Sequence, residues 1–586
     1  MTKTNDKMQA NVDVEADMDD SRIPTGIDIP LLNSFAGDSI DYKGRQALRS
    51  NSGSWRSAVF IIGVEVAERF AYYGISSNLI TYLTGPLGQS TATAAENVNV
   101  WTGTASLLPL VGGFVADGLL GRYRTIIIAS LLYILALGML ALTTLVPSGA
   151  ESFVVVTSSP PHLQVIIFFI SLYLVAFAQG CHKPCVLAFG ADQFDASDAH
   201  ECRAKSSFFN WWYFGMCAGP AVGIFVISYI QDNLSWGLGF GIPCIVMGLA
   251  LIIFLLGTMQ YRFQKKTEGK SAFVRIGRVF VEAARNWRTT RPMASLEDQA
   301  CETITHQGSQ QFTFLNKALL SLDESNETGT ICSIDEVEEA KAVLRLIPIW
   351  ASLLAYSTVL SQTSTLFTKQ GATLDRSIGP TFEIPAATLQ SFIGLSIMIL
   401  IPIYDTILVP VSRSVTNKPF GITMLQRIGT GLFISIALMV ISALIESKRL
   451  KTAKEYGLQD DPETMIPMKI WWLLPQYLLA GAADVFTVVG MQEFFYDQVP
   501  RELRSIGVAL YLSVSGVGNF MSSFLISIVE KITRRDGEES WISDNLNKGH
   551  IDYFYYLLAG ISSVAFVMYV YAAKSYVYNR GRAISM

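Results

Sequence analysis

The first long apolar run of the chain contains the stretch Gly63-Val64-Glu65-Val66-Ala67-Glu68-Arg69-Phe70. A helix that crosses a bilayer tolerates almost no charge, since each one costs about 2.5 to 3.5 kcal/mol at the helix centre. Positions i, i+3 and i+4 of a helix share one face, so Glu65, Glu68 and Arg69 form a single polar stripe. That stripe must face protein or water. We predict that it serves ions, protons or substrate; a purely structural polar cluster is the alternative.

The composition is typical of a membrane protein. Of the 586 residues, 50% are hydrophobic and only 16% are charged, and the mean hydropathy is +0.35. The apolar residues form blocks of roughly 20 residues, the length that spans a bilayer. We therefore predict an all-α membrane protein with about twelve transmembrane helices. The blocks lie near residues 57–83, 98–120, 125–146, 163–189, 206–229, 236–257, 343–368, 386–410, 424–446, 470–494, 503–529 and 551–575.

The predicted spans fall into two six-helix halves joined by a long polar segment. Basic residues follow the second, fourth and sixth spans, which places both termini in the cytosol under the positive-inside rule. Apolar residues from Phe273 to Trp287 recur at helical spacing, as in an interfacial helix or a linker helix on the protein surface. The expected segments are a disordered cytosolic tail (1–54), an N-terminal six-helix bundle (55–257), a cytosolic linker with the interfacial helix (258–342), a C-terminal six-helix bundle (343–575) and a cytosolic tail (576–586).

No sequence pattern indicates a metal site, a cofactor site or enzyme chemistry. Cys181 and Cys185 flank a His and a Lys beside Pro184, but no second ligand pair lies near them in the sequence. We interpret this stretch as helix packing rather than as a metal site. No phosphate-binding loop or nucleophile triad is visible, so we expect no enzyme, and no cofactor other than a coupling proton. Without a basic patch or tail, we expect no nucleic-acid partner.

The two halves contain a weak internal sequence repeat. Asp192-Gln193 follows the fourth span and Asp497-Gln498 follows the tenth, and basic residues and serine come after each pair. Related halves around a polar midplane site are common in secondary transporters, which rock about that site to open it to each side in turn. No repeated ring resembles the selectivity filter of a channel. The pattern therefore favours a transporter over a channel.

Several stretches of the sequence resemble one family. The stretch Glu65-Val66-Ala67-Glu68-Arg69-Phe70-Ala71-Tyr72-Tyr73-Gly74 resembles the E-x-x-E-R-F-x-Y-Y-G signature of the proton-coupled peptide transporters, in the plant nitrate/peptide branch of the major facilitator superfamily. The resemblance runs from about Trp55 to Val529, and it implies two six-helix bundles and symport driven by a proton gradient. Further matching stretches are Gly112 to Arg122, Lys183 to Asp195, Phe208 to Gly215, Phe382 to Pro385 and Gln492 to Gln498.

A proton-coupling site is expected between the first and fourth spans. Lys183 lies beside Pro184 in an apolar span, where an isolated ammonium is costly, so we predict an ion pair between Lys183 and Glu65 or Glu68. The resemblance implies the same lysine. It also implies that protonation of the carboxylates weakens this pair and so couples proton uptake to the rocking of the halves. The expected proton-coupling residues are Glu65, Glu68, Arg69 and Lys183.

Two departures from the family pattern concern the substrate. Asp484 stands in the tenth span, where the family usually has a Glu that meets a substrate amine. Leu360 stands in the seventh span, where the nitrate-binding member has a His. Without a protonatable imidazole, nitrate cannot be held in the same way. The expected substrate-binding residues are Tyr72, Tyr73, Lys183, Asn210, Gln362, Asp484 and Tyr511.

We therefore expect a proton-coupled symporter that works by alternating access on nitrate, di- or tripeptides, or other small organic anions. We expect it in the plasma membrane or the vacuolar membrane, with the lipid bilayer and a small anionic or zwitterionic molecule as partners. The alternative is a nutrient sensor that a kinase regulates at Thr125, which matches the family's regulatory site. Asp117, Arg122 and Arg124, around the loop after the second span, are expected to act in gating.

Overall fold

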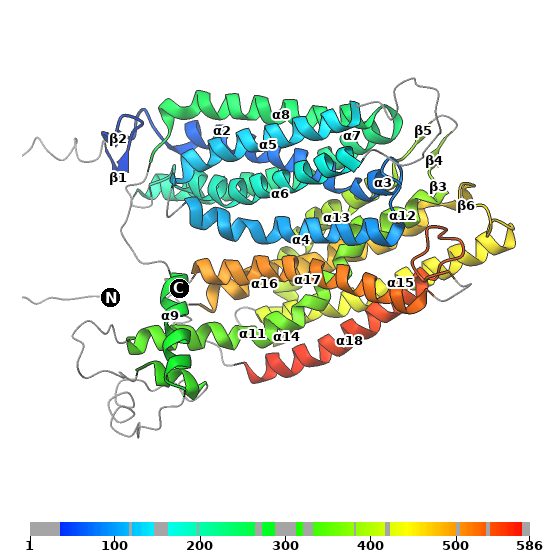
Figure 1. Cartoon of the computed structure of the whole chain (residues 1–586). Coiled ribbons are helices and arrows are strands. Elements are labelled where there is room, and N and C mark those ends of the chain that lie inside the picture. Colours follow the sequence, from blue (N-terminus) through cyan, green and yellow to red (C-terminus); the bar gives the residue numbers. More distant parts are fainter. Residues whose placement is uncertain are drawn as a thin grey trace, which may run out of the picture.

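Long helices make up most of the computed structural model of the chain (Figure 1). It describes residues 35–116, 120–145, 162–195, 198–263, 272–287, 312–319, 332–379, 382–416, 422–499, 504–534 and 539–576. The first bundle contains α2 (Ser54–Ser76), α4 (Thr91–Val115), α5 (Arg122–Leu145), α6 (His162–Ala191), α7 (Ala199–Asn233) and α8 (Trp236–Leu256). The second bundle contains α11 (Ile334–Leu360), α13 (Ser391–Ile403) with its continuation α14 (Val409–Thr416), α15 (Met424–Glu455), α16 (Leu474–Asp497), α17 (Arg504–Thr533) and α18 (Ile551–Ser575).

The long helices have the length and composition of membrane spans. Eleven helical spans among the described residues are apolar enough to cross a bilayer. Helix α2 is not among them, because Glu65, Glu68 and Arg69 make it too highly charged. These three side chains are nevertheless buried inside the first bundle. The predicted all-α membrane fold in two six-helix bundles is confirmed.

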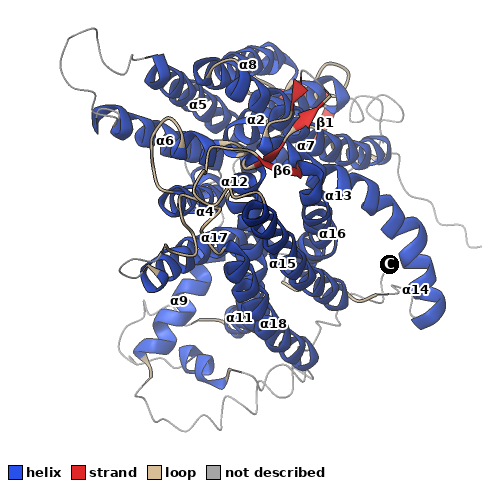
Figure 2. Ribbon diagram, turned by 90° about the vertical axis from the view of Figure 1, so that its right-hand side faces the viewer, coloured by secondary structure: helices blue, strands red, loops and turns tan. Residues whose placement is uncertain are grey.

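The helices run between two faces of the molecule, which we name after the chain ends. The termini face holds the start of α2 and the end of α18, and the far face holds the other ends of these two helices. In Figure 1 the termini face is at the left and the far face at the right. Short strands, red in Figure 2, form three two-stranded sheets among the described residues. They pair β1 (Phe35–Ile40) with β2 (Gln46–Leu48), β3 (Leu374–Asp375) with β6 (Ile466–Lys469), and β4 (Ser377–Ile378) with β5 (Phe382–Glu383).

The segment before α2 is ordered from residue 35, which corrects the expectation of a disordered tail over residues 1–54. Strands β1 and β2 pair antiparallel in a hairpin on the termini face. Arg49, just after the hairpin, forms an ion pair with Asp195 at 2.7 Å. The polar composition of the tail does not reveal this docking, because its partners are distant in the sequence. Residues 1–34 lie outside the described residues.

The predicted linker helix is present as α9 (Ala272–Arg285). Its residues Ile276, Val279 and Ala283 are buried in a cluster with residues of α11 and of the 3₁₀ helix η3 (Thr313–Leu319). Arg278 donates from one guanidinium nitrogen to both carboxylate oxygens of Glu336, each at 2.6 Å. One face of α9 therefore packs against protein, as in the surface-linker interpretation.

Helix α11 begins earlier than the predicted boundary at residue 343, because a capping box defines its first turn. The Ser333 side chain accepts a hydrogen bond from the Glu336 N–H, and the Glu336 side chain accepts one from the Ser333 N–H. Such reciprocal bonds satisfy two backbone donors at a helix start. The extra turns of α11 provide the surface on which α9 docks.

Helices α4 and α6 cross at two glycines, Gly112 and Gly180. A Cβ atom on Gly112 would overlap the Gly180 carbonyl oxygen, and one on Gly180 would overlap the Leu108 side chain. Small residues allow helix backbones to approach this closely. The crossing fixes the position of Lys183, which lies one turn beyond Gly180 on α6.

Polar contacts join the far-face halves of the two bundles. Lys369 Nζ donates to Thr84 Oγ1 at 2.9 Å, and Gln390 Nε2 donates to the Ser77 carbonyl oxygen at 2.8 Å. These contacts hold the far-face ends of the bundles together. Two further contacts are Thr91 N–H to Asp544 at 2.6 Å and Asn99 to Ser522 at 3.0 Å.

Candidate functional site

Arg69 joins two carboxylates in the interior of the first bundle. Its Nε lies 2.9 Å from Glu65 Oε1, and its Nη2 lies 2.8 Å from Glu68 Oε2. All three side chains are at most 1% exposed. Removing one partner from a buried ion pair costs about 3 to 5 kcal/mol, because the other charge is left without compensation. Protonation of either carboxylate would therefore weaken the hold on Arg69.

Lys183 lies close to these carboxylates without forming the predicted ion pair. It interacts with Glu65 and Glu68 through their charges. Within the described chain, however, the ion pairs of both carboxylates are with Arg69. The predicted pairing with Lys183 is therefore wrong. Arg69 takes this position because it follows Glu65 by four residues on one helix, a spacing that places the two side chains side by side.

His182 and Tyr133 extend the cluster, and neither residue was predicted from the sequence to have a role in function. His182 is fully buried, and its ligand atom and those of Glu65 and Glu68 lie within 4.8 Å of one another. Tyr133, on α5, donates from its hydroxyl to Glu68 Oε1 at 3.5 Å. The available signal for His182 was a polar side chain in an apolar span. Carboxylate and imidazole are metal-ligand types, but Arg69 already forms ion pairs with both carboxylates.

A cavity of about 470 Å³ lies between the two bundles. Arg69 and Lys183 line it from the first bundle, and Asp484 lines it from the second. This volume falls within the range of about 300 to 1,000 Å³ that is usual for small-molecule sites. The cavity therefore brings cationic and anionic side chains to one space. Its hydroxyl and amide side chains include Ser76, Thr102, Ser106, Gln179, Ser357, Ser361, Thr363, Ser364, Gln390, Ser391, Ser515 and Asn519.

Tyr356 holds Asp484 in place. The tyrosine hydroxyl donates to Asp484 Oδ1 at 2.6 Å. Tyr356 was not predicted from the sequence, although it precedes Leu360 by four residues and so shares its helix face. Leu360 also lines the cavity, as expected from its place in the seventh span. An aliphatic side chain therefore stands where the family pattern suggested an imidazole.

The structure does not bring all of the predicted substrate-binding residues to the cavity. Gln362 is fully buried, donates to Ser522 Oγ at 2.8 Å and is not among the described residues that line the cavity. Gln362 follows Leu360 by two positions, so its side chain lies on a different face of the helix and points toward α17. Asn210 lies in α7, but its side chain is outside the part of the chain that the structure describes. The predicted residues that line the cavity are Tyr72, Tyr73, Lys183, Asp484 and Tyr511.

Two of the three expected gating residues, Arg122 and Arg124, lie at the start of α5. Arg122 forms an ion pair with Asp192 at the end of α6, a contact within the first bundle. Arg124 is exposed, and Asp117 lies outside the described residues. Thr125 is only 2% exposed, and its hydroxyl donates to the Gly121 carbonyl oxygen at 3.0 Å. A kinase cannot reach this hydroxyl in the present conformation.

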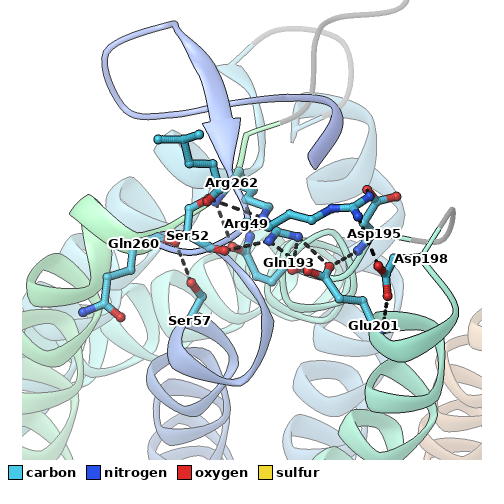
Figure 3. A network of polar contacts seen from close by, with 10 residues as sticks. Arg49, Ser52, Ser57, Gln193, Asp195, Asp198, Glu201, Gln260 and Arg262 are labelled. Atoms are coloured by element: carbon cyan, nitrogen blue, oxygen red, sulfur yellow. Dashed lines mark hydrogen bonds and ion pairs between the residues drawn. The ribbon is translucent and has the colours of Figure 1, made fainter. Parts of the chain in front are cut away.

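A second buried polar network surrounds Arg262 on the termini face (Figure 3). The guanidinium donates to both carboxylate oxygens of Glu201, at 2.6 and 3.0 Å, and to the Ser52 carbonyl oxygen at 2.7 Å. The Arg262 N–H donates to Gln193 Oε1 at 2.9 Å. Gly53 has φ +75°, and a Cβ there would overlap the guanidinium, so only glycine fits. The network ties together the chain before α2, after α6, in α7 and after α8.

The weak internal repeat of the sequence corresponds to a contact that occurs in both bundles. Gln193, after the fourth long helix, binds Arg262 in the chain that leaves the sixth helix. In the second bundle, Gln498 follows the corresponding helix α16 and accepts a hydrogen bond from the Tyr576 hydroxyl at 3.3 Å. Tyr576 is in the chain that leaves α18. The contacts support the predicted relation between the two halves.

Replacing Arg262 by Met should destabilise the protein by about 3 to 5 kcal/mol, because Glu201 would keep a buried charge without a partner. Thermal unfolding of the purified protein in detergent measures this. The double variant Arg262→Met with Glu201→Gln should recover much of the loss. Arg124→Met, an exposed arginine on the same face, is the matched control. Equal unfolding temperatures for Arg262→Met and the control would contradict a structural role of the network.

The comparisons with known proteins agree with this architecture. The sequence profile of the POT family, PTR2, matches residues 123–542. Protein NRT1/PTR FAMILY 5.10 of Arabidopsis thaliana is 61% identical over 542 residues, which cover 92% of this chain and 96% of that protein. The chain also resembles the crystal structure of an auto-inhibited POT family peptide transporter, with a TM-score of 0.68 and 23% identity over 90% of this chain and 98% of that one.

A second similar structure contains a bound small molecule. It is a POT family transporter in complex with 5-aminolevulinic acid, with a TM-score of 0.61 and 15% identity over 89% of this chain and 96% of that one. At these identities the structural comparisons establish the fold, while the family match comes from the sequence. The chain therefore belongs to the POT family of proton-dependent oligopeptide transporters, whose members are membrane transporters rather than enzymes.

Proposed function

We propose that this transporter is a proton-coupled symporter of small solutes that carry an anionic group at one end and a cationic or hydrogen-bonding group at the other. The observation that carries this proposal is the charge arrangement of the cavity. Arg69 and Lys183 line it from the first bundle, and Asp484 lines it from the second. Opposite charges on two walls complement a zwitterion. Hydroxyl and amide groups on the remaining surface suit a polar solute.

Coupling follows from the balance of charges near the cavity. Glu65 and Glu68 carry two negative charges, and Arg69 and Lys183 carry two positive ones. A proton on either carboxylate leaves this group with a net positive charge. That charge favours binding of an anionic group, and the bound anion in turn favours the proton. Proton and solute therefore promote each other's binding, as symport requires.

The conformation suits a carrier that opens to the termini face. Contacts such as Lys369 with Thr84 join the far-face ends of the two bundles. In our proposal the termini face is cytosolic, as the basic loops predict. The described conformation then faces the cytosol, and rocking of the bundles would break the far-face contacts and expose the cavity to the other side.

The range of solutes includes peptides, amino-acid-like zwitterions and organic anions. A related POT structure holds 5-aminolevulinic acid, which carries an amine and a carboxylate. A cavity of about 470 Å³ is much larger than nitrate needs. Nitrate remains a candidate as a weakly held substrate, because Leu360 offers it no hydrogen bond. The plasma membrane and the vacuolar membrane are the proposed locations.

The alternative of a sensor regulated at Thr125 receives less support. A phosphorylation switch requires an accessible hydroxyl, whereas Thr125 is buried and bonded to its own helix turn. Of the residues expected for proton coupling, by contrast, Arg69 and Lys183 line the cavity. Arg69 also forms ion pairs with the other two, Glu65 and Glu68. Transport is therefore the function that we propose.

Uptake into proteoliposomes, with a panel of solutes at two external pH values, tests the proposal. Nitrate, a dipeptide, a single amino acid and a dicarboxylate represent the candidate classes. Each pH unit supplies ~1.4 kcal/mol per coupled proton, enough for about tenfold accumulation. Accumulation of a zwitterion that follows the pH gradient is the expected result. Uptake of every solute that ignores both the pH gradient and a membrane potential would overturn symport.

Replacing Leu360 by His should increase nitrate uptake at acidic pH. The new imidazole would face the cavity and become cationic around its ordinary pKa of about 6.5, where it can hold an anion. We expect an increase of about tenfold at pH 5.5, because a hydrogen bond to a charged group is worth about 1.5 kcal/mol, and little change at pH 8. Leu512→His, elsewhere on the cavity wall, is the control. Strong nitrate uptake by the unmodified protein, unchanged in Leu360→His, would show that another group holds the anion.

A further inference from the structure

Three buried side chains that lie close together in the first bundle carry polar atoms without hydrogen-bond partners. Within the described chain, neither nitrogen of His182 has a hydrogen-bond partner, and neither does Glu65 Oε2. Glu68 Oε2 also accepts no hydrogen bond, although it forms the ion pair with Arg69. Each of the three residues is at most 1% exposed. A buried polar atom without a partner costs about 1 to 3 kcal/mol, so this concentration requires an explanation.

The missing partner is a proton rather than a metal ion. The ligand atoms of Glu65, Glu68 and His182 lie within 4.8 Å of one another, a spacing that also suits a cation. Arg69, however, is bound to both carboxylates, and Lys183 adds a second positive charge nearby. A divalent ion would have to displace one cation and approach the other. A single proton needs neither change, and it turns one carboxylate into a hydrogen-bond donor.

We propose that His182 is a positioning residue of the proton site, whose neutral imidazole accepts the hydrogen bond of the protonated carboxyl group of Glu65 or Glu68. The proton comes from water, and it forms an O–H bond on one carboxylate oxygen. The imidazole nitrogen accepts that O–H and so stabilises the protonated state. Burial in the bundle interior and the positive charge of Arg69 keep the imidazole neutral, because both disfavour a further positive charge at this place. The titratable and charged groups that face the cluster are Glu65, Glu68, Arg69, Tyr72 and Tyr73 from α2, Tyr133 from α5, and Lys183 from α6.

This arrangement explains how a buried proton site can be filled at moderate pH. Two buried carboxylates share one guanidinium, so burial and the repulsion between the two negative charges favour a proton on one of them. A hydrogen-bond acceptor that is satisfied only in the protonated state adds to this preference. The inference deepens the proposed symport and rests on it for its role in transport. The binding of the proton can be measured without any substrate.

Infrared difference spectroscopy of the purified protein tests this proposal. The carbonyl stretch of a protonated carboxylic acid reports proton binding directly, and loss of the band in Glu65→Gln or Glu68→Gln identifies the acid. The midpoint is the pH at which this band has half of its full intensity. In His182→Leu, which has no hydrogen-bond acceptor, we expect the midpoint to fall by about one pH unit, which is a tenfold loss of proton affinity. In His182→Gln, whose amide oxygen can accept, we expect the midpoint to return toward that of the unmodified protein.

The control is His162→Leu, an exposed histidine at the start of the same helix. Thermal unfolding identifies variants that fail to fold. If His182→Leu fails to fold, His182→Met is used in its place. A midpoint that is equal in the apolar variant and the unmodified protein would overturn the proposal. If the midpoint moves as expected but no solute is accumulated, the proton site stands and the proposed symport fails. If a solute is accumulated but the midpoint does not move in the apolar variant, the proposed symport stands and the proposed role of His182 fails.

Discussion

Replacing Lys183 by Ala is expected to lower proton-driven uptake by ~30-fold or more. Removing the cation that pairs with an anionic group of the bound solute costs 2 kcal/mol or more, which corresponds to about this factor. Lys183 lines the cavity and interacts through its charge with Glu65 and Glu68. Its removal deprives an anionic group of the solute of its partner. It also leaves two carboxylates facing Arg69 alone, so that a bound proton is released less readily. Initial rates of uptake into proteoliposomes measure the effect.

Lys183→Arg should restore only part of this activity. A guanidinium is planar and broad, whereas the ammonium is compact, so the charge returns without the original fit. Lys451→Ala is the matched control, since Lys451 is well exposed at the far end of α15. Uptake by Lys183→Ala at the level of this control would remove Lys183 from the site.

Replacing Glu68 by Gln should abolish accumulation driven by a pH gradient while solute exchange continues. The amide resembles the protonated carboxyl group in shape and polarity but cannot release a proton. A gradient of one pH unit allows up to about tenfold accumulation per coupled proton, and the variant should only equilibrate. Exchange of external for internal solute requires no net proton release, so counterflow should remain. Glu65→Gln should behave in the same way, because Arg69 binds both carboxylates.

The measurement compares accumulation and counterflow in the same proteoliposome preparation. Glu455→Gln is the control, because Glu455 is an exposed acid at the end of α15. Accumulation that persists in both Glu65→Gln and Glu68→Gln would exclude these carboxylates from proton coupling. Loss of both accumulation and counterflow would instead indicate a defect in the carrier cycle or in folding.

The number and order of the spans could be predicted because the bilayer imposes a length and a polarity on each of them. Apolar blocks near residues 236–257 and 551–575 correspond closely to α8 and α18. Capped ends were harder to place, since the capping box at Ser333 extends α11 beyond the apolar block. The polar stripe of α2 was recognisable because the bilayer also limits the charge that a span can carry. Charge in an apolar helix requires partners, so Glu65, Glu68 and Arg69 had to face the interior.

The partners of these charges, by contrast, depended on contacts between helices. Local spacing favoured the bonds from Arg69 to its own helix, yet the predicted partner of the carboxylates was Lys183. His182 was visible in the sequence, but its closeness to Glu65 and Glu68 results from the packing of α6 on α2. Tyr356 and Gln362 lie six residues apart in one span, and the tertiary structure directs only Tyr356 to Asp484. Arg262 likewise finds Glu201 across a long separation in the sequence.

The sequence by itself determined that this chain is a membrane transporter with a charged site in its first span, because hydrophobic length and the cost of buried charge are local properties. The tertiary structure decided which charges meet. It assigned both carboxylates to Arg69, placed Lys183 and Asp484 on opposite walls of one cavity, and enclosed His182 beside the acids. Such choices depend on helix crossings, like the one at Gly112 and Gly180, whose geometry arises only when distant segments pack together.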